Sequence, residues 1–254
     1  MGRLRKIDDN VGMIPRFHVP FPLAPGATVE LPKEAAYHAL KVLRVGAGDT
    51  AILFDGRGGQ WTATLQPAGK GLRAVLTGYD DADLEPPLRV TLVQCLPAAD
   101  KMDFVVQKAV ELGVSRIQPV AAKRSVIRLS GERMDKRVTH WRHIVSASCE
   151  QCGRNRVPEV APILDLPQYL AMAAEHNDLR LICLPGAEMS VRDLKIPGQT
   201  VSIFVGPEGG LEEGEIRMAK LAGFRALGLG PRVLRTETAG PAALAALMTL
   251  WGDF

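Results

Sequence analysis

Two glycine-containing segments near the C-terminus have residue types that suit ligand binding. Gly206-Pro207-Glu208-Gly209-Gly210 directly follows the apolar run Val201–Val205, and Leu227–Ala239 reads LGLGPRVLRTETA. Glycine lets the main chain approach a ligand closely, and open α/β folds bind ligands where their strands end. Each segment alone is typical of an ordinary tight turn. Two such segments, about 20 residues apart and both charged, favour a small-molecule pocket built from main chain.

Motifs for several other chemistries are missing from the sequence. It contains no GxxxxGK[ST], no GxGxxG after the first strand and no GxSxG. These absences disfavour P-loop NTPases, nucleotide-binding oxidoreductases and α/β-hydrolases. Cys149 and Cys152 form a CxxC just after His140 and His143, but four ligands along one straight helix cannot close a tetrahedron. We therefore expect no metal site.

The positive charge of the chain is concentrated in one segment. Residues 123–156 hold nine Lys or Arg and three acidic residues, whereas the net charge of the whole protein is only +3. A run of charges is usually a solvated face. An excess of this size in one segment makes contact with a polyanion a reasonable hypothesis.

The segments that must position the glycine loops alternate between strand and helix. Strands are expected at 88–96, 114–120, 157–163, 179–184, 200–205 and 225–229, and helices at 101–112, 132–152, 166–176, 212–222 and 238–251. This order predicts a mostly parallel sheet with helices on both faces. Asp100 is expected to cap the helix at 101–112. The last helix is apolar nearly all round, so either a second subunit or the rest of the monomer must cover it. Pro241 favours a helix start near Thr238.

The N-terminal third has a different pattern. Short strands are expected at 16–19, 28–31, 50–54, 61–66 and 72–78, with one helix at 33–43, which is typical of a small β-barrel. An acidic and proline-containing stretch follows and predicts a linker. No apolar run is long enough for a membrane span, and no secretory signal is present, so we expect a cytoplasmic protein.

Five blocks of sequence resemble a known family. Gly206–Gly210 and Leu229–Ala239 are similar to the two C-terminal motifs of SPOUT-class RNA methyltransferases, and most of all to those of the bacterial 16S ribosomal RNA uridine-N3 methyltransferases. KAVELGV at 108–114, CEQCGR at 149–154 and HALKVLR at 38–44 resemble three further motifs of that family. The likeness runs from about Pro15 to the end of the chain.

The resemblance implies a fold and a domain organisation. It implies an α/β fold with a mostly parallel sheet and a C-terminal trefoil knot (SPOUT-like), preceded by a small PUA-like β-barrel. The implied domains are a polar extension at 1–13, a PUA-like RNA-binding domain at 14–82, a linker at 83–87 and a SPOUT-like methyltransferase domain at 88–254. It also implies a homodimer, no membrane, and 16S rRNA in the small ribosomal subunit as substrate.

The resemblance further implies S-adenosylmethionine as cofactor, held at the knot by three loops. The implied cofactor-binding residues are Leu184, Pro185, Gly186, Val205, Gly206, Pro207, Glu208, Gly209, Gly210, Leu229, Gly230, Arg232, Leu234, Arg235, Thr238 and Ala239. Methylation at uracil N3 requires loss of the N3 proton, which a general base assists. Glu208 and Glu237 are the candidate bases by position, and Arg154 and Arg235 are the candidate stabilisers of the uracil anion.

The basic residues and the β module are where RNA is expected to bind. The candidate contacts are Arg16, His38, Arg44, Lys123, Arg124, Arg128, Arg133, Arg137, Arg154 and Arg156. Structural roles remain open for the charged pocket residues, since Glu237 could simply favour a helix N-terminus and Arg235 could brace it. Two other functions also remain open. One is methylation of a different RNA or of a ribose 2′-hydroxyl, and the other is a non-catalytic RNA- or ribosome-binding protein.

Overall fold

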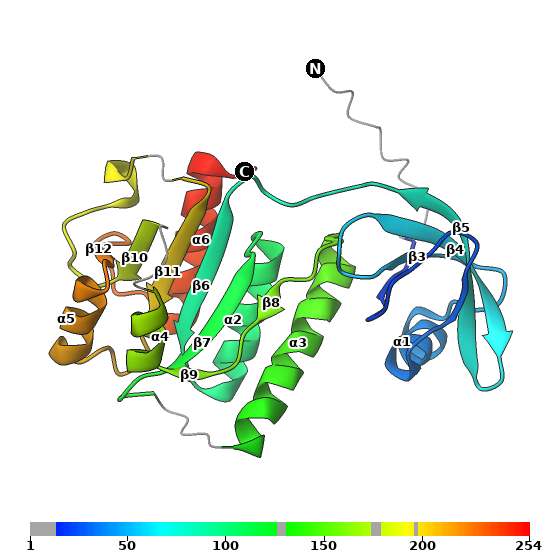
Figure 1. Cartoon of the computed structure of the whole chain (residues 1–254), viewed down its shortest axis with the longest axis horizontal. Helices are drawn as coiled ribbons and strands as arrows, with labels where there is room; N and C mark the ends of the chain where they lie inside the picture. Colours follow the sequence, from blue (N-terminus) through cyan, green and yellow to red (C-terminus); the bar gives the residue numbers. More distant parts are fainter. Residues whose placement is uncertain (1–13, 126–130, 174–178, 196–197) are drawn as a thin grey trace. The chain divides into compact units, whose positions relative to one another are not determined.

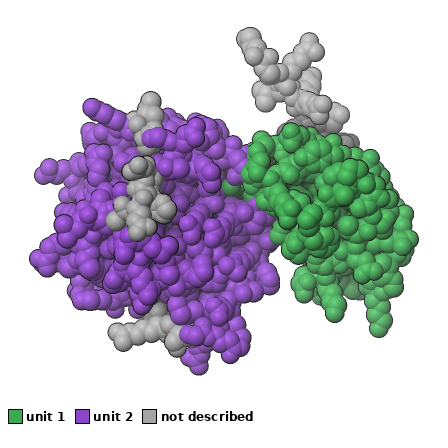
Figure 2. Space-filling model, in the orientation of Figure 1, with its two compact units in different colours: residues 1–84, 150–156 green, residues 85–149, 157–254 purple. Residues whose placement is uncertain are grey.

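The computed structural model describes residues 14–125, 131–173, 179–195 and 198–254. The chain divides into two compact units (Figure 2). The N-terminal unit runs to Leu84 and also includes Glu150–Arg156. The C-terminal unit comprises Glu85–Cys149 and Val157–Phe254.

The N-terminal unit is built on a mixed five-stranded sheet in the order β1-β3-β4-β5-β2 (Figure 1). β1 (Arg16–His18) pairs parallel with β3 (Thr50–Phe54). β4 (Gln60–Ala68) pairs antiparallel with β3 and with β5 (Gly71–Asp80), which in turn pairs antiparallel with β2 (Thr28–Glu30). Alternate residues along these strands face one core, as the alternation in sequence predicts.

The single helix predicted at 33–43 is continuous but irregular. It begins as α1 (Lys33–Tyr37) and continues as a π-helical turn, η1 (His38–Leu43). Arg44 ends it in the left-handed conformation, with φ 57°. A π turn accommodates one more residue than an α turn, and such turns are frequent at functional sites.

The C-terminal unit is a parallel sheet in the order β12-β10-β11-β6-β7-β8, with β9 also on β7. Its strands are β6 (Arg89–Cys95), β7 (Arg116–Ala121), β8 (Glu159–Val160), β9 (Leu164–Asp165), β10 (Leu179–Cys183), β11 (Thr200–Val205) and β12 (Arg225–Leu227). The prediction of a long strand at 157–163 is wrong, since β8 is the only strand within that range and β9 begins just after it. Pro158 and Pro162 have no N–H to donate to a neighbouring strand.

Helices cover both faces of this sheet (Figure 1). α4 (Leu166–Ala173) and α5 (Glu213–Leu221) pack on one face, where Val93 and Phe204 belong to their apolar cluster. On the other face α2 (Ala99–Glu111) packs against α6 (Thr236–Trp251), and α6 lies against β6 and β11. α3 (Glu132–Cys152) is tied to α2, because Trp141 and His140 both bond the Asp103 carboxylate. A short 3₁₀ turn, η2 (Val191–Asp193), was not predicted.

Helices α2 and α6 both begin earlier in the chain than predicted. α2 begins at Ala99, and Asp100 lies within its first turn rather than capping it. α6 begins at Thr236, so the predicted start near Thr238 is wrong by two residues and Pro241 lies inside the helix. Hydrogen bonds of the Thr236 hydroxyl with Gln94 on β6 and with the Gly206 carbonyl fix this earlier start. The trefoil knot remains a prediction, and none of the described helices is both long and apolar enough to cross a membrane.

Candidate functional site

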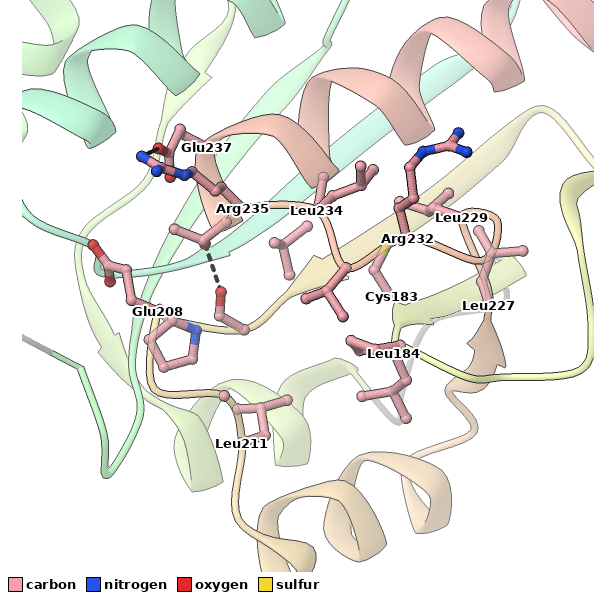
Figure 3. A pocket seen from close by; sticks show the side chains of 18 of the residues that line it. Cys183, Leu184, Glu208, Leu211, Leu227, Leu229, Arg232, Leu234, Arg235 and Glu237 are labelled. Carbon is pink, nitrogen blue, oxygen red and sulfur yellow. Dashed lines mark hydrogen bonds and ion pairs between the residues drawn. The ribbon is translucent and has the colours of Figure 1, made fainter.

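A cavity of about 420 Å³ opens at the carboxyl ends of β10, β11 and β12. The loops that follow these three strands form most of it, and the first turns of α2 and α6 complete it (Figure 3). All of its walls belong to the C-terminal unit. The two glycine-containing segments singled out in the sequence therefore meet in one pocket, as the ends of parallel strands in one sheet must.

Most residues predicted for cofactor binding line this cavity. They are Leu184, Pro185, Val205, Gly206, Pro207, Glu208, Gly210, Leu229, Gly230, Arg232, Leu234, Arg235 and Ala239. Gly186, Gly209 and Thr238 do not line it. Six further residues line the cavity and were not predicted individually: Lys101, Cys183, Leu211, Leu227, Val233 and Thr236. Of the predicted catalytic residues, Glu208, Arg235 and Glu237 are at the cavity.

The charged end of the cavity is organised by Lys101, from the first turn of α2. Its Nζ lies 3.2 Å from Glu208 Oε1 and 3.6 Å from Glu237 Oε2. Arg235 Nη1 lies 3.9 Å from Glu237 Oε1, and 82% of the Arg235 side chain is exposed. Two carboxylates and two cations thus share one end of the pocket, and Figure 3 labels three of the four residues, Glu208, Arg235 and Glu237.

The two carboxylates differ in how fully they are engaged. Glu208 Oε1 accepts a hydrogen bond from the N–H of Ala98 at 2.9 Å, next to the N-terminus of α2. Burial acts to raise the pKa of Glu208, but hydrogen bonds from the Ala98 and Glu208 N–H groups and from Lys101 outweigh it, so the pKa lies below its ordinary value. Oε2 of Glu237 is buried and accepts no hydrogen bond within the described chain. Glu237 therefore retains more unused acceptor capacity than Glu208.

Thr236 fixes the start of α6 to the sheet. Its hydroxyl donates to the carbonyl of Gly206 at 2.6 Å and accepts from Nε2 of Gln94 at 3.0 Å. Gln94 is fully buried on β6. This short chain of hydrogen bonds joins β6, the loop after β11 and the first turn of α6, so it sets the shape of the wall that they share.

The opposite end of the cavity is lined mainly by apolar side chains, with the exposed Arg232 beside them (Figure 3). Leu184, Leu227 and Leu229 line it together with Cys183 (Figure 3). Burial raises the pKa of the Cys183 thiol to about 12, so the thiol stays protonated and uncharged at neutral pH. This end suits a flat, uncharged group better than an ion.

Gly228 lets two loops pass each other beside this apolar end. Its N–H donates to the Met189 carbonyl at 2.8 Å, and a β-carbon on Gly228 would collide with the carbonyl oxygen of Ala187. No other residue type fits there without moving the 187–189 backbone. No role was predicted for Gly228, because glycine is required there only by the close approach of a loop some 40 residues earlier in the chain.

The loop after β7 is fastened to the glycine segment at 206–210 from outside the cavity. Glu215, only 2% exposed, accepts hydrogen bonds from the N–H groups of Lys123 and Glu212 at 2.9 and 2.8 Å. Lys123 and Arg124 both pair with Glu212, and Arg124 also donates to the Gly209 carbonyl. Lys123 and Arg124 were predicted RNA contacts, and in the free protein both have intramolecular partners.

The other predicted RNA contacts differ in exposure. Arg133 is exposed and Arg137 half-buried on α3, while Arg128 lies outside the described residues. His38 and Arg44 are exposed on η1 and at its end. None of these assignments to RNA is tested by the protein alone, so they remain predictions.

Two arginines predicted to contact RNA make side-chain contacts within the N-terminal unit, and a third is buried there. The Arg16 guanidinium donates to the Gly153 carbonyl and to Gln60, and lies 5.1 Å from the ring centre of Phe54. Arg156 bonds Asp83 and the Arg57 carbonyl. Arg154, the predicted uracil stabiliser, is only 5% exposed and does not line the cavity of Figure 3.

No group of three or more His, Cys, Asp or Glu side chains suited to a metal ion occurs in the described part of the chain. The four cysteines are free thiols. The pocket therefore offers main chain, leucine side chains, two carboxylates and cations, a set suited to an organic ligand.

Known proteins match nearly the whole chain. Residues 84–248 match the RNA methyltransferase domain family, and residues 31–72 match the RNA methyltransferase PUA domain family. A ribosomal RNA small subunit methyltransferase E from Buchnera aphidicola is 31% identical over 94% of this chain and 98% of its own length. The protein of the same name from Bacillus subtilis is 30% identical, over 87% of this chain and 89% of its own length.

Solved structures show the same relationship. The ribosomal RNA small subunit methyltransferase E from Neisseria gonorrhoeae, bound to S-adenosylmethionine, is 43% identical, with a TM-score of 0.87 over 95% of this chain and 99% of that one. A Legionella pneumophila protein in complex with the same cofactor is 35% identical, with a TM-score of 0.91 over 96% of this chain and 100% of that one. The predicted fold class, a PUA-like mixed-sheet domain followed by a parallel α/β methyltransferase domain of SPOUT type, is confirmed. The chain belongs to the ribosomal RNA small subunit methyltransferase E family.

Proposed function

We propose that this protein transfers a methyl group from S-adenosylmethionine to N3 of a uridine in 16S rRNA of the small ribosomal subunit, in the cytoplasm. The observation that carries the proposal is the meeting of both glycine-containing segments in one pocket, with an unsatisfied carboxylate oxygen of Glu237 at its charged end. Relatives that match nearly the whole chain carry the name of a small-subunit rRNA methyltransferase.

The pocket fits the cofactor in size and in chemistry. Its volume of about 420 Å³ falls within the range of small-molecule sites. The leucine-lined end suits the adenine ring, and the carbonyl and N–H groups of the glycine loops can read its edge. The carboxylates at the other end suit the positively charged part of the molecule. When bound, S-adenosylmethionine supplies an electrophilic methyl group.

The residues of the charged end have different roles in removing the N3 proton and stabilising the anion that forms. Glu237 is the better candidate to accept the N3 proton, because Glu208 accepts a hydrogen bond from Ala98, whereas Oε2 of Glu237 accepts none within the described chain. Arg235 is mostly exposed and able to turn toward the uracil oxygens, where a guanidinium would stabilise the negative charge that develops. Lys101 stays beside both carboxylates and contributes to the lowered pKa of Glu208.

A pair of substitutions separates the two carboxylates. Glu237→Gln is expected to lower kcat by about 10²- to 10⁴-fold with little change in the affinity for S-adenosylmethionine, because only proton removal is lost. Glu208→Gln keeps an acceptor for the Ala98 N–H, so we expect a much smaller loss of kcat. Equal losses in both variants would contradict the assignment of Glu237 as base.

We further propose that the protein acts as a homodimer that uses α6. Ala242, Ala245 and Ala246 on this helix are only half-buried, and Leu250 is 45% exposed. A second copy would cover this small-residue face. Sedimentation analysis that finds only monomer at micromolar concentration would reject the dimer without affecting the assignment of the pocket.

Transfer of labelled methyl groups tests the function directly. Purified protein and labelled S-adenosylmethionine are incubated with small subunits or 16S rRNA from a strain that lacks the enzyme, and the methylated nucleoside is then identified. N3-methyluridine is the expected product. A ribose-methylated nucleoside would identify a different reaction, and cofactor binding by calorimetry without any transfer would favour a non-catalytic RNA-binding protein.

A further inference from the structure

A second cavity, of about 430 Å³, lies entirely within the N-terminal unit. It is a groove between the α1–η1 helix and the hairpin that joins β4 to β5. Its floor is apolar, formed by Leu31, Ala36 and Leu72. The groove is as large as the cofactor pocket, and no function described so far uses it.

The rim of this groove collects positive charge. Lys33, Lys41 and Lys70 all line it, and they are the only lysines among the described residues of the N-terminal unit. All three are exposed, and none makes an ion pair or side-chain hydrogen bond within the described chain. Glu30 is the single acidic residue of the lining. Three free ammonium groups around one groove favour an anionic occupant.

An exposed aromatic ring lies between two of these lysines. Lys33, Tyr37 and Lys41 follow one another at four-residue spacing, so they rise along one side of the helix, with Lys70 contributed by the hairpin. Tyr37 is 65% exposed and has no partner for its ring or hydroxyl within the described chain. An aromatic surface for a base beside cations for the phosphates is the usual arrangement in single-strand nucleic acid sites.

We propose that this groove binds a single-stranded segment of RNA, with a base stacked on Tyr37 and the flanking phosphates beside Lys33, Lys41 and Lys70. The proposal deepens the proposed function and rests on it for the identity of the RNA. The same helix continues into the π turn that carries His38 and Arg44, two predicted RNA contacts. An acidic peptide would satisfy the lysines, but it would leave the face of the Tyr37 ring without a partner.

Binding of a short RNA to the full-length protein tests the groove. The probe is a fluorescently labelled eight-nucleotide oligouridine, titrated by anisotropy at several salt concentrations. Replacing all three lysines by Gln should reduce the slope of log affinity against log salt by about 2, because each phosphate contact with a single strand contributes about 0.7. Tyr37→Ala should weaken binding roughly tenfold, whereas Tyr37→Phe keeps the ring and should bind like wild type.

Arg73→Gln is the matched control, because it removes one cation from the same unit outside the groove, where Arg73 bonds Gln66. It should leave the affinity and the salt slope close to those of wild type. Unchanged binding by both the triple lysine variant and Tyr37→Ala would overturn the proposal, and capture of an acidic peptide instead would do the same. Because the oligouridine assay does not depend on methyl transfer, loss of the proposed function and loss of the groove would be seen separately.

Discussion

Lys101 places its ammonium group between the two carboxylates of the cofactor pocket, 3.2 Å from Glu208 and 3.6 Å from Glu237. Two carboxylates that share a site repel each other, and one of them binds a proton more tightly unless a cation lies nearby. Lys101 is such a cation and contributes to the lowered pKa of Glu208. Because Lys101 also lies 3.6 Å from Oε2 of Glu237, the proposed base, it acts as a positioning residue for that carboxylate as well.

Lys101→Met should therefore change the pH dependence of methyl transfer. Loss of the ammonium removes one cause of the lowered pKa of Glu208 and takes away the positive charge 3.6 Å from Glu237 Oε2, so the acidic limb of the pH–rate profile should move to higher pH. The rate should fall roughly tenfold or more at mildly acidic pH and much less at alkaline pH. Single-turnover rates measured across the pH range test this. Lys101→Arg retains the charge and should restore the limb, whereas an equal loss at every pH would mean that Lys101 only supports the fold.

Some residues of the pocket can be predicted from the sequence and others cannot. Gly206–Gly210 and Leu227–Ala239 were predicted as ligand loops, because glycines and charges adjoin apolar runs. Lys101 was not predicted, and Thr236 lay inside the second loop without an assigned role. Both roles depend on partners that only the fold brings close, Glu208 for Lys101 and the Gly206 carbonyl for Thr236. A contact between distant segments leaves no local pattern in the chain.

At the scale of elements, the loop after β12 and the loop after β10 approach each other closely at Gly228 and Ala187, beside the pocket. Gly228→Ala would drive a β-carbon into the Ala187 carbonyl, which is backbone and cannot swing aside as a side chain can. We expect a loss of about 1–3 kcal/mol in the free energy of unfolding and at least tenfold weaker cofactor binding. Urea unfolding and calorimetry measure these two quantities.

Gly214→Ala provides the matched control within the same unit. Gly214 lies in α5 with open space around it and an ordinary helical backbone. Alanine is the better helix former, so this variant should be as stable as wild type or slightly more stable. If Gly228→Ala were equally well tolerated, the proposed close approach of the two loops would be wrong.

The C-terminal turn of α3 contributes a buried carboxylate to the N-terminal unit. Glu150 accepts a hydrogen bond from the His18 N–H at 2.8 Å. Burial raises its pKa, although the His18 hydrogen bond and the charges of His38 and Arg16 act in the opposite direction. A raised pKa means that folding favours the protonated form. The carboxyl group therefore contributes its stability below its ordinary pKa, and that contribution is lost as the pH rises through the pKa of the folded state.

Glu150→Gln should remove this pH dependence. The amide still accepts from the His18 N–H but carries no charge to desolvate, so the variant should be more stable than wild type at about pH 8, by under about 1 kcal/mol. The difference should disappear near the ordinary pKa of the carboxyl group. Thermal unfolding at both pH values tests this. A variant less stable than wild type at pH 8 would show that the attraction of Arg16 outweighs the cost of burial.

The elements that were predicted well are those whose pattern is local. The helix at 101–112 was evident from apolar residues at helical spacing, and it forms as Ala99–Glu111. The strand at 157–163 and the start of α6 were not predicted correctly, because prolines interrupt the first and the hydrogen bonds of Thr236 fix the second. The π turn at 38–43 was read as ordinary helix, since its sequence has no feature that separates the two.

At the scale of the whole molecule, the two proposed ligand sites lie in different units. The cofactor cavity is walled only by the C-terminal unit, and the groove beside Tyr37 only by the N-terminal unit. Each unit also has an apolar core of its own. Because each unit has its own core, a bound ligand can stabilise one unit against unfolding and leave the stability of the other unchanged.

Hydrogen exchange with and without S-adenosylmethionine tests this separation. A ligand at 100 times its Kd stabilises the unit that binds it by about 2.7 kcal/mol. Amides that exchange only when the C-terminal unit unfolds should therefore slow by up to about 100-fold, and the loops at 184–186, 205–211 and 227–239 should also gain local protection. Peptides from 14–84 should exchange at an unchanged rate. Gly228→Ala at the same cofactor concentration should show weaker protection, because its pocket is distorted. Equal slowing in both units would show instead that they unfold as one cooperative body, and the cofactor would then stabilise the RNA-binding groove as well.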